Sequence, residues 1–124
     1  MPEFADFVIT LSHGKSSEKH VSIAFTLALK SQEKGYDTAI ILLLDGVHIG
    51  ETGYADDIDI GEPFLPVKDM LEVFLSQGGR LLACGSCWKH EHIPESSLLA
   101  GASIITASDV IDLLMNAKSS MQLN

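Results

Sequence analysis

Short apolar runs that alternate with segments of helical spacing constrain the fold of this chain more than any other feature. The runs span residues 7–11, 38–44, 80–84 and 103–106. The run 38–44 would place apolar side chains on both faces of a strand, which is typical of a parallel sheet covered by helices on both sides. The sequence therefore predicts four buried strands of such a sheet.

The segments between these runs have the apolar spacing of amphipathic helices, with capping residues near their starts and glycines near their ends. The expected helical segments are 16–35 with Ser16 or Ser17 as its cap, 67–77, a short turn that Pro94 opens and that runs through Leu99, and 108–117 with Ser108 as its cap. The tail, 119–124, has no clear pattern and is left unassigned.

Alternating strands and helices predict one domain over residues 1–124, an α/β fold built as a three-layer α/β/α sandwich with a mainly parallel sheet. The reason is that each step between parallel strands needs a crossover, which is right-handed in nearly every known case. In such sheets, ligands and chemistry gather at the carboxyl ends of the strands. Here that edge should hold the segments 12–15, 45–48 and 84–87.

The segment 47–66 is harder to assign, because glycine and proline residues punctuate an acidic stretch. Loops of this length inside a compact domain tend to be lids, binding loops or subunit contacts, so we expect an exposed functional or oligomeric loop. Its apolar residues need cover, which places the segment at a subunit interface or over the cysteine site described next. These residues are Ile58, Ile60, Phe64 and Leu65.

Composition narrows the classes of function. The chain carries 17 acidic and 8 basic residues, for a net charge of -9, which disfavours binding to a nucleic-acid backbone. No run of about 20 apolar residues is present to span a membrane, and the first six residues lack the basic and apolar regions of a signal peptide. We therefore expect a cytoplasmic protein with neither a membrane nor a nucleic-acid partner.

Two cysteines, Cys84 and Cys87, stand where the third strand should end. If the chain turns into a helix there, free backbone N–H groups and the helix dipole would favour a thiolate at Cys84. Lys89, His90 and His92 add charged or titratable groups within a few residues. A C-x-x-C pair in a cytoplasmic chain is more often catalytic or metal-binding than structural, so Cys84 is the candidate nucleophile and Cys87 its candidate second thiol.

The segment 78–87, Gly-Gly-Arg-Leu-Leu-Ala-Cys-Gly-Ser-Cys, resembles the DsrE/DsrF/TusD and YchN-like sulfur-relay family. A second strand that ends in Asp45-Gly46-Val47 matches the family's pattern, as does the early strand followed by a loop and a long helix. The resemblance covers nearly the whole chain. One departure stands out: Glu91-His92 replaces the family's Arg-Gly pair, so Lys89 or a histidine would have to supply the cation expected beside the thiolate.

The resemblance implies an intracellular persulfide carrier of the sulfurtransferase type. Cys84 matches the family's sulfur-carrying cysteine, and Cys87 matches a second cysteine found in part of the family. The implied partners are a protein persulfide donor and a thiol acceptor, and the implied assembly is a homo-oligomer, a trimer or a hexamer. No bound cofactor is needed. Cys87 would resolve a Cys84 persulfide into an internal disulfide by ordinary thiol exchange.

Two other functions stay open on the sequence alone. Cys84, Cys87, His90 and His92 are ligand types that zinc takes, although structural sites usually draw their ligand pairs from separate segments. Alternatively, the chain is an oligomeric module that binds a small ligand without turnover, with the segment 12–15 holding an anion at the start of the first helix. That segment lacks the glycine patterns of nucleotide-binding loops.

Overall fold

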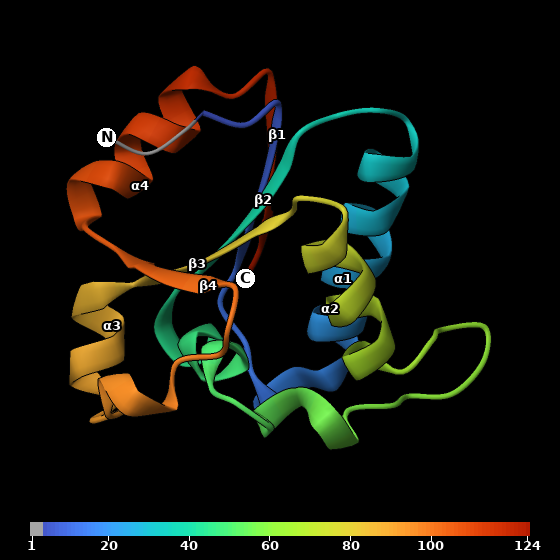
Figure 1. Ribbon diagram of the computed structural model, residues 1–124, viewed down its shortest axis with the longest axis horizontal. Coiled ribbons are helices and arrows are strands. Elements are labelled where there is room, and N and C mark those ends of the chain that lie inside the picture. The colour runs from blue at the N-terminus through green and yellow to red at the C-terminus, as the bar shows by residue number, and fades with distance from the viewer. Residues whose placement is uncertain (1–3) are drawn as a thin grey trace.

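The computed structural model describes residues 4–124 and contains a five-stranded sheet in which every neighbouring pair is parallel (Figure 1). The strand order is β4-β3-β2-β1-β5. The strands are β1 (Phe7–Leu11), β2 (Thr38–Leu42), β3 (Arg80–Cys84), β4 (Ala102–Ile105) and β5 (Ser119–Leu123). Because β3 lies between β2 and β4, the strand that ends in Cys84 is an interior strand.

Helices cover both faces of the sheet, which confirms the predicted three-layer α/β/α architecture. α1 (Glu18–Glu33) and α2 (Val67–Ser76) pack side by side on one face, and α4 (Ala107–Asn116) packs on the other (Figure 1). A short helix, α3 (Gly85–His90), follows β3 directly. The 3-10 turns are η1 (Lys15–Ser17), η2 (Leu44–Gly50), η3 (Tyr54–Asp57) and η4 (Glu95–Ser97). Within residues 4–124, every helix is too short or too polar to cross a membrane.

Alternation of side chains along the strands divides the interior into two cores of different size. Ile9, Ile40 and Leu81 face α1 and α2, where Phe25 and Phe74 meet edge to face with ring centroids 6.0 Å apart. On the opposite face, Val8 and its neighbours meet α4 in a smaller core of Val8, Ala39, Ile41, Leu82, Val110 and Leu113. By this alternation, Cys84 lies on the same side of the sheet as Leu82.

Helix and strand ends differ from the sequence-based prediction at several positions. Residues 119–123, which had been left unassigned, form β5 because their backbone pairs with β1, a contact between distant parts of the chain. The predicted cap of the last helix, Ser108, is wrong. Thr106 caps α4 instead, and its hydroxyl and the Asp109 carboxylate form a reciprocal capping box. For α1, Ser17 rather than Ser16 is the cap.

The segment 47–66 is more folded than the expected exposed loop. Residues 47–50 and 54–57 belong to η2 and η3, and Val47, Ile49 and Ile58 are fully buried in the larger core. η2 packs against α3 and the end of β3, close to the cysteines. Only the portion after η3 projects from the body of the molecule, as the loop before α2 in Figure 1, and Leu65 there is 59% exposed.

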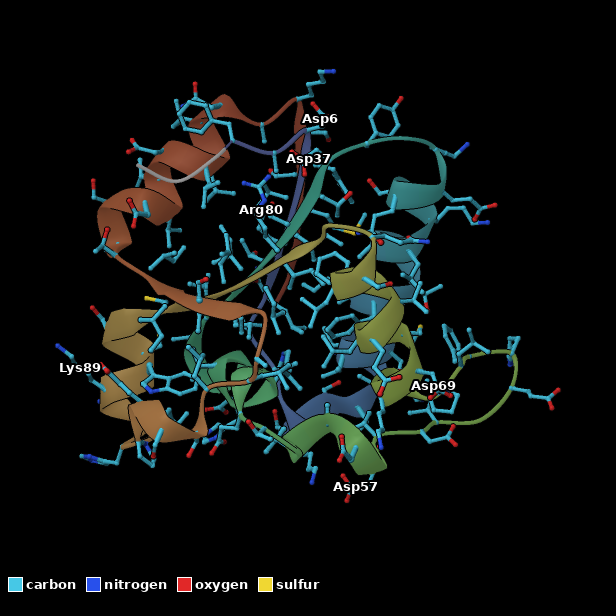
Figure 2. The ribbon with its side chains drawn as sticks, viewed as in Figure 1. Asp6, Asp37, Asp57, Asp69, Arg80 and Lys89 are labelled. Carbon is cyan, nitrogen blue, oxygen red and sulfur yellow. The ribbon has the colours of Figure 1, made fainter. Side chains whose placement is uncertain are left out.

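Charged residues link four strands at the amino end of the sheet, where Asp6, Asp37 and Arg80 lie together (Figure 2). Arg80 at the start of β3 binds the Asp37 carboxylate, with a nitrogen–oxygen distance of 3.0 Å, and the Phe4 carbonyl at 3.1 Å. The Asp37 backbone N–H donates to the Asp6 carboxylate at 3.0 Å, and Lys118 binds that carboxylate at 3.4 Å. This charge chain, Arg80–Asp37–Asp6–Lys118, follows the strand order β3-β2-β1-β5.

Candidate functional site

The carboxyl ends of the strands surround a cavity of about 860 Å³, here called the carboxyl-end cavity. Its walls come from the loop after β1, from η2, from α3 and from the end of the chain. The lining residues are Ser12, His13, Ser16, Leu44, Asp45, Ser86, Cys87, His90, Glu91 and Asn124. Parts of all three segments that the sequence placed at this edge therefore line one cavity.

Gly46 explains why the turn after β2 can approach β1 so closely. A β-carbon at this position would overlap the backbone carbonyl of Leu11, so only glycine fits there. The neighbouring backbone is held by hydrogen bonds from the Leu43 N–H to the Leu11 carbonyl at 3.0 Å and from the Gly46 N–H to the Leu43 carbonyl at 2.8 Å. Leu44 between them adopts a φ of 51°, which redirects the chain away from the sheet and into the cavity wall.

The two cysteines are neighbours with different exposure. Cys84 ends β3 and is 7% exposed, whereas Cys87 in the first turn of α3 is half-buried and lines the carboxyl-end cavity. Burial raises the pKa of the Cys87 thiol above its usual value, and the nearby Cys84 side chain and the Glu91 charge raise it further. A hydrogen bond from the Leu44 backbone acts in the opposite direction, because it favours the thiolate.

Of the three basic or titratable residues predicted beside the thiols, only His90 lines the cavity. Lys89 is exposed, and its side chain points away from α3 into solvent (Figure 2). His92 is also exposed and has a φ of 57°. The residue at the position of the family's arginine, Glu91, does line the cavity, so the charge beside Cys87 is negative rather than positive.

A histidine held between two carboxylates adjoins the cavity. His48 in η2 places its Nδ1 2.6 Å from Glu51 Oε2 and its Nε2 2.9 Å from Glu91 Oε1. The Tyr54 ring stacks on the imidazole with a centroid distance of 5.4 Å. The sequence predicts His48 at this edge of the sheet but does not identify its two partners. The spacing of three residues between His48 and Glu51, which would bring them together on a helical turn, is the one signal in the sequence for this contact.

The segment after β1 divides between the cavity and a neighbouring ion pair. Ser12 and His13 line the cavity, whereas the Lys15 ammonium lies 2.9 Å from the Asp57 carboxylate and 4.7 Å from the centroid of the Tyr54 ring. The Lys15 backbone N–H donates to the Tyr54 hydroxyl at 2.8 Å. The cation that an anion site would use is therefore engaged with η3, and Asp57 is the acidic residue that holds it.

The four residues considered as zinc ligands do not assemble into a metal site. Within residues 4–124, no three histidine, cysteine or acidic side chains are grouped so that they could hold a metal ion. Cys84 is buried at the end of β3, while His90 and His92 are exposed and lie beyond the first turn of α3. This arrangement does not favour the zinc interpretation.

Comparison with known proteins identifies the family to which the chain belongs. The model of the DsrE/DsrF-like family matches residues 5–123, almost the whole chain. The chain belongs to the DsrE/DsrF-like family. Its sequence is 26% identical over 112 residues to the uncharacterized protein MK0008 of Methanopyrus kandleri, a match that covers 90% of this chain and 88% of that protein.

Two solved structures share this family fold. The ychN protein from E. coli superposes with a TM-score of 0.73 at 24% identity, and the match covers 94% of this chain and 97% of that one. Protein MTH1491 from Methanobacterium thermoautotrophicum, described as of unknown function, superposes with a TM-score of 0.68 at 13% identity, covering 94% and 96% of the two chains. At these identities, the two structures support the fold alone.

Proposed function

We propose that this DsrE/DsrF-like protein is a sulfur-relay protein that carries sulfur as a persulfide on its cysteine pair. The observation that supports this most directly is the pair itself: Cys84 and Cys87 adjoin at the carboxyl end of an interior strand, and one of them lines a cavity. Two adjoining thiols beside an accessible space are what a carrier needs in order to take up sulfur and pass it on. Family membership adds to the argument.

The chemistry is thiol–persulfide exchange. A cysteine thiolate attacks the outer sulfur of a donor persulfide, a new S–S bond forms, and the donor's own S–S bond breaks. The electron pair of the broken bond leaves with the donor thiolate, and the proton lost by the cysteine goes to solvent or to that thiolate. An acceptor thiolate then attacks the outer sulfur of the protein persulfide in the same way. No oxidant is consumed in either step.

The order of the two cysteines is the open part of the scheme. The sequence and the family resemblance assign the persulfide to Cys84, with Cys87 as the thiol that attacks it, forms a Cys84–Cys87 disulfide and releases hydrosulfide. The exposure of the two residues bears on this order, because a donor in the cavity meets Cys87 before the more buried Cys84. The assignment of Cys84 as the carrier remains a prediction.

The departure from the family's Arg-Gly pair changes how a thiolate is stabilised. Glu91 puts a negative charge near Cys87, and Lys89 points into solvent. The group that favours a thiolate at Cys87 is instead the Leu44 backbone, which is presented by the turn at Gly46. A backbone N–H can stabilise a sulfur anion without carrying a full charge.

The test is intact-mass measurement after incubation with a small-molecule persulfide donor. We expect the wild-type chain to gain the mass of one sulfur atom, Cys84→Ser to lose at least most of this gain, and Cys84→Ser with Cys87→Ser to lose all of it. Retention of the gain in Cys84→Ser with loss in Cys87→Ser would reverse the order of the two cysteines. If neither cysteine gained sulfur, the relay function itself would be rejected.

The proposal includes protein partners and self-association. A persulfide donor and a thiol acceptor must both bring their sulfur to the carboxyl-end cavity, and a homo-oligomer, a trimer or a hexamer, is implied by the family resemblance. Exposed apolar side chains are available for such contacts: Ile111 and Met115, one turn apart on α4, are 59% and 79% exposed. Native mass measurement of the purified chain gives the oligomeric state, and a monomer at micromolar concentration would remove this part of the proposal.

A further inference from the structure

His48 has a hydrogen-bonding arrangement that constrains its protonation. Both of its ring nitrogens lie within hydrogen-bonding distance of carboxylate oxygens, 2.6 Å from Glu51 and 2.9 Å from Glu91. A neutral imidazole has one N–H donor and one lone pair, so one of these contacts would set a lone pair against a carboxylate. The imidazolium form donates in both directions. The geometry therefore fits a positive charge between two negative ones.

This bridge connects two elements that are distant in the sequence. His48 and Glu51 belong to η2 and its end, and Glu91 follows α3, the helix that carries Cys87. The side chains of all three are roughly a quarter exposed. The Tyr54 ring covers one face of the imidazole, with the Lys15 ammonium beyond it and Asp57 paired to that ammonium. The ion pair is thus more sheltered than an ordinary surface pair.

Glu91 links the bridge to the sulfur. Glu91 and Cys87 line the same cavity, and the Glu91 charge raises the pKa of the Cys87 thiol, whereas the hydrogen bond from the Leu44 backbone lowers it. The other titratable groups around Cys87 are the Cys84 thiol and the cavity residues His13, Asp45 and His90. Among these groups, Glu91 is a carboxylate that a partly buried histidine holds in place, because His48 binds one of its oxygens.

We propose that His48 is a positioning residue of the sulfur site: as an imidazolium it ties Glu91 to η2 and thereby reduces the negative potential at the Cys87 sulfur. The bearing of this bridge on sulfur transfer rests on the proposed function, whereas its effect on the thiol does not. In this view, the positive charge that the family places next to the thiol is replaced by a histidine that acts through the glutamate.

The proposal predicts opposite effects from the two ends of the bridge. With Glu91→Gln, the negative charge near Cys87 disappears and the thiolate forms more readily. With His48→Gln, the negative charge of Glu91 remains but is no longer held at η2, so the thiolate forms less readily. If the bridge only held η2 and α3 together, both substitutions would change thiolate formation at Cys87 in the same direction, because each of them breaks the same contact.

The experiment measures the rate of alkylation by iodoacetamide between pH 7 and 10, followed by intact mass, in a Cys84→Ser background. Cys87 is then the one remaining cysteine, because the chain has two. At pH 7 we expect Glu91→Gln to react about three- to ten-fold faster than this background, and His48→Gln about three-fold slower, as expected for a change in one nearby charge. The matched control is Glu95→Gln, which removes one negative charge from an exposed residue of η4 that belongs neither to the bridge nor to the cavity lining, and it should change the rate by less than about two-fold.

A double variant separates action through Glu91 from direct action. If His48 works by holding Glu91, then adding His48→Gln to Glu91→Gln should leave the rate nearly unchanged. If His48→Gln slowed alkylation equally whether residue 91 is glutamate or glutamine, the histidine would act by its own charge, and the positioning role would be overturned. The same would follow if His48→Gln and Glu91→Gln shifted the rate in the same direction.

Folding can be checked in the same samples. Trp88 is the single tryptophan of the chain, is 2% exposed and has its ring beside Gly50 at the end of η2. Its fluorescence therefore reports whether α3 still packs on η2. Backbone hydrogen bonds from Leu99 to Gly50 and from Thr52 to Ser97, each 2.8 Å, hold η2 independently of His48, so we expect unchanged fluorescence in the folded variants. Failure of sulfur uptake would reject the relay function and leave these alkylation results standing.

Discussion

The two ends of the parallel sheet use charged side chains in different ways. At the amino end, the charge chain Arg80–Asp37–Asp6–Lys118 runs along the strand order, so each charge has an opposite charge or a backbone donor beside it. At the carboxyl end, the His48 bridge and Glu91 stand next to two thiols and an open cavity. The charges at the amino end hold strands together, and those at the carboxyl end set the electrostatic environment of the cysteine thiols.

The comparison shows where a substitution should affect folding and where it should affect chemistry. Changes at the amino end should lower the free energy of unfolding and leave the reactivity of Cys87 unaltered. Changes at the carboxyl end should alter the reactivity of Cys87 and have little effect on the free energy of unfolding, unless they disturb the backbone that forms the cavity.

Gly46→Ala should have the largest effect, because the added methyl group would overlap the Leu11 carbonyl, and backbone atoms cannot move aside as a flexible side chain can. We expect a loss of about 3 kcal/mol in the free energy of unfolding, together with slower alkylation of Cys87 as the Leu44 turn shifts. The matched control is Gly35→Ala at the other end of the sheet. Gly35 has a φ of 90° and an open surrounding, so alanine should cost about 1 kcal/mol and leave alkylation unchanged.

Thr38→Val tests a buried contact near the amino end. The Thr38 hydroxyl donates to the Tyr36 carbonyl at 3.0 Å and lies 2.7 Å from the Ser31 hydroxyl of α1, which is therefore the donor of that second bond. Valine would leave the Ser31 hydroxyl buried without its acceptor, for a loss of about 1–2 kcal/mol in urea denaturation. Ser31→Ala should cost less, because Thr38 keeps its bond to Tyr36. Equal losses in the two variants would contradict this account.

Most of the fold could be predicted from the sequence, because the information is local. The strands ending in Leu11 and Cys84 are continuous apolar runs, and the helices between them have clear apolar spacing. The apolar run 38–44 misled at its end, since Leu43 and Leu44 continue the hydrophobic pattern while Leu44 adopts a positive φ. The fifth strand was missed because its polar residues have no strand pattern of their own and are ordered by pairing with β1.

The candidate site could be predicted only in part. The cysteines and the sheet edge followed from sequence position, as did the presence of His48 at that edge. The bridge to Glu91 did not, because 43 residues separate it from His48 and tertiary packing alone brings the two together. Sequence proximity likewise suggested Lys89 and His92 as neighbours of the thiols, but both residues are exposed to solvent, Lys89 within α3 and His92 just after it.

Arg80→Leu should weaken the charge chain at the amino end by a smaller amount. The Arg80 side chain is 20% exposed, but its partner Asp37 is 51% exposed, and exposed pairs contribute little. We expect a loss of about 1 kcal/mol in the free energy of unfolding at low salt, and a smaller loss at 1 M salt because screening already weakens the pair in the wild type. Cys87 alkylation should stay within error of the wild-type rate. A changed alkylation rate would mean that the two ends of the sheet are coupled.

The smallest expected effect concerns the pH dependence of stability that His48 contributes. Burial by itself would lower the pKa of His48, but its hydrogen bonds and attraction to Glu51 and Glu91 outweigh burial and raise the pKa above 6.5. The folded protein therefore binds the proton more tightly than the unfolded chain. The resulting stabilisation is fully present below about pH 6.5 and is lost as the pH rises through the higher folded-state value.

Comparing Cys87→Ser with Cys87→Ser/His48→Gln removes the titration of the Cys87 thiol from the measurement of stability. By urea denaturation, the difference between these two proteins should be larger at pH 6 than at pH 9, by less than about 1 kcal/mol because the pair is partly exposed. A His48 difference that grew with pH would mean that the histidine is neutral in the folded protein, and the bridge at the carboxyl end would then not carry the charge assigned to it.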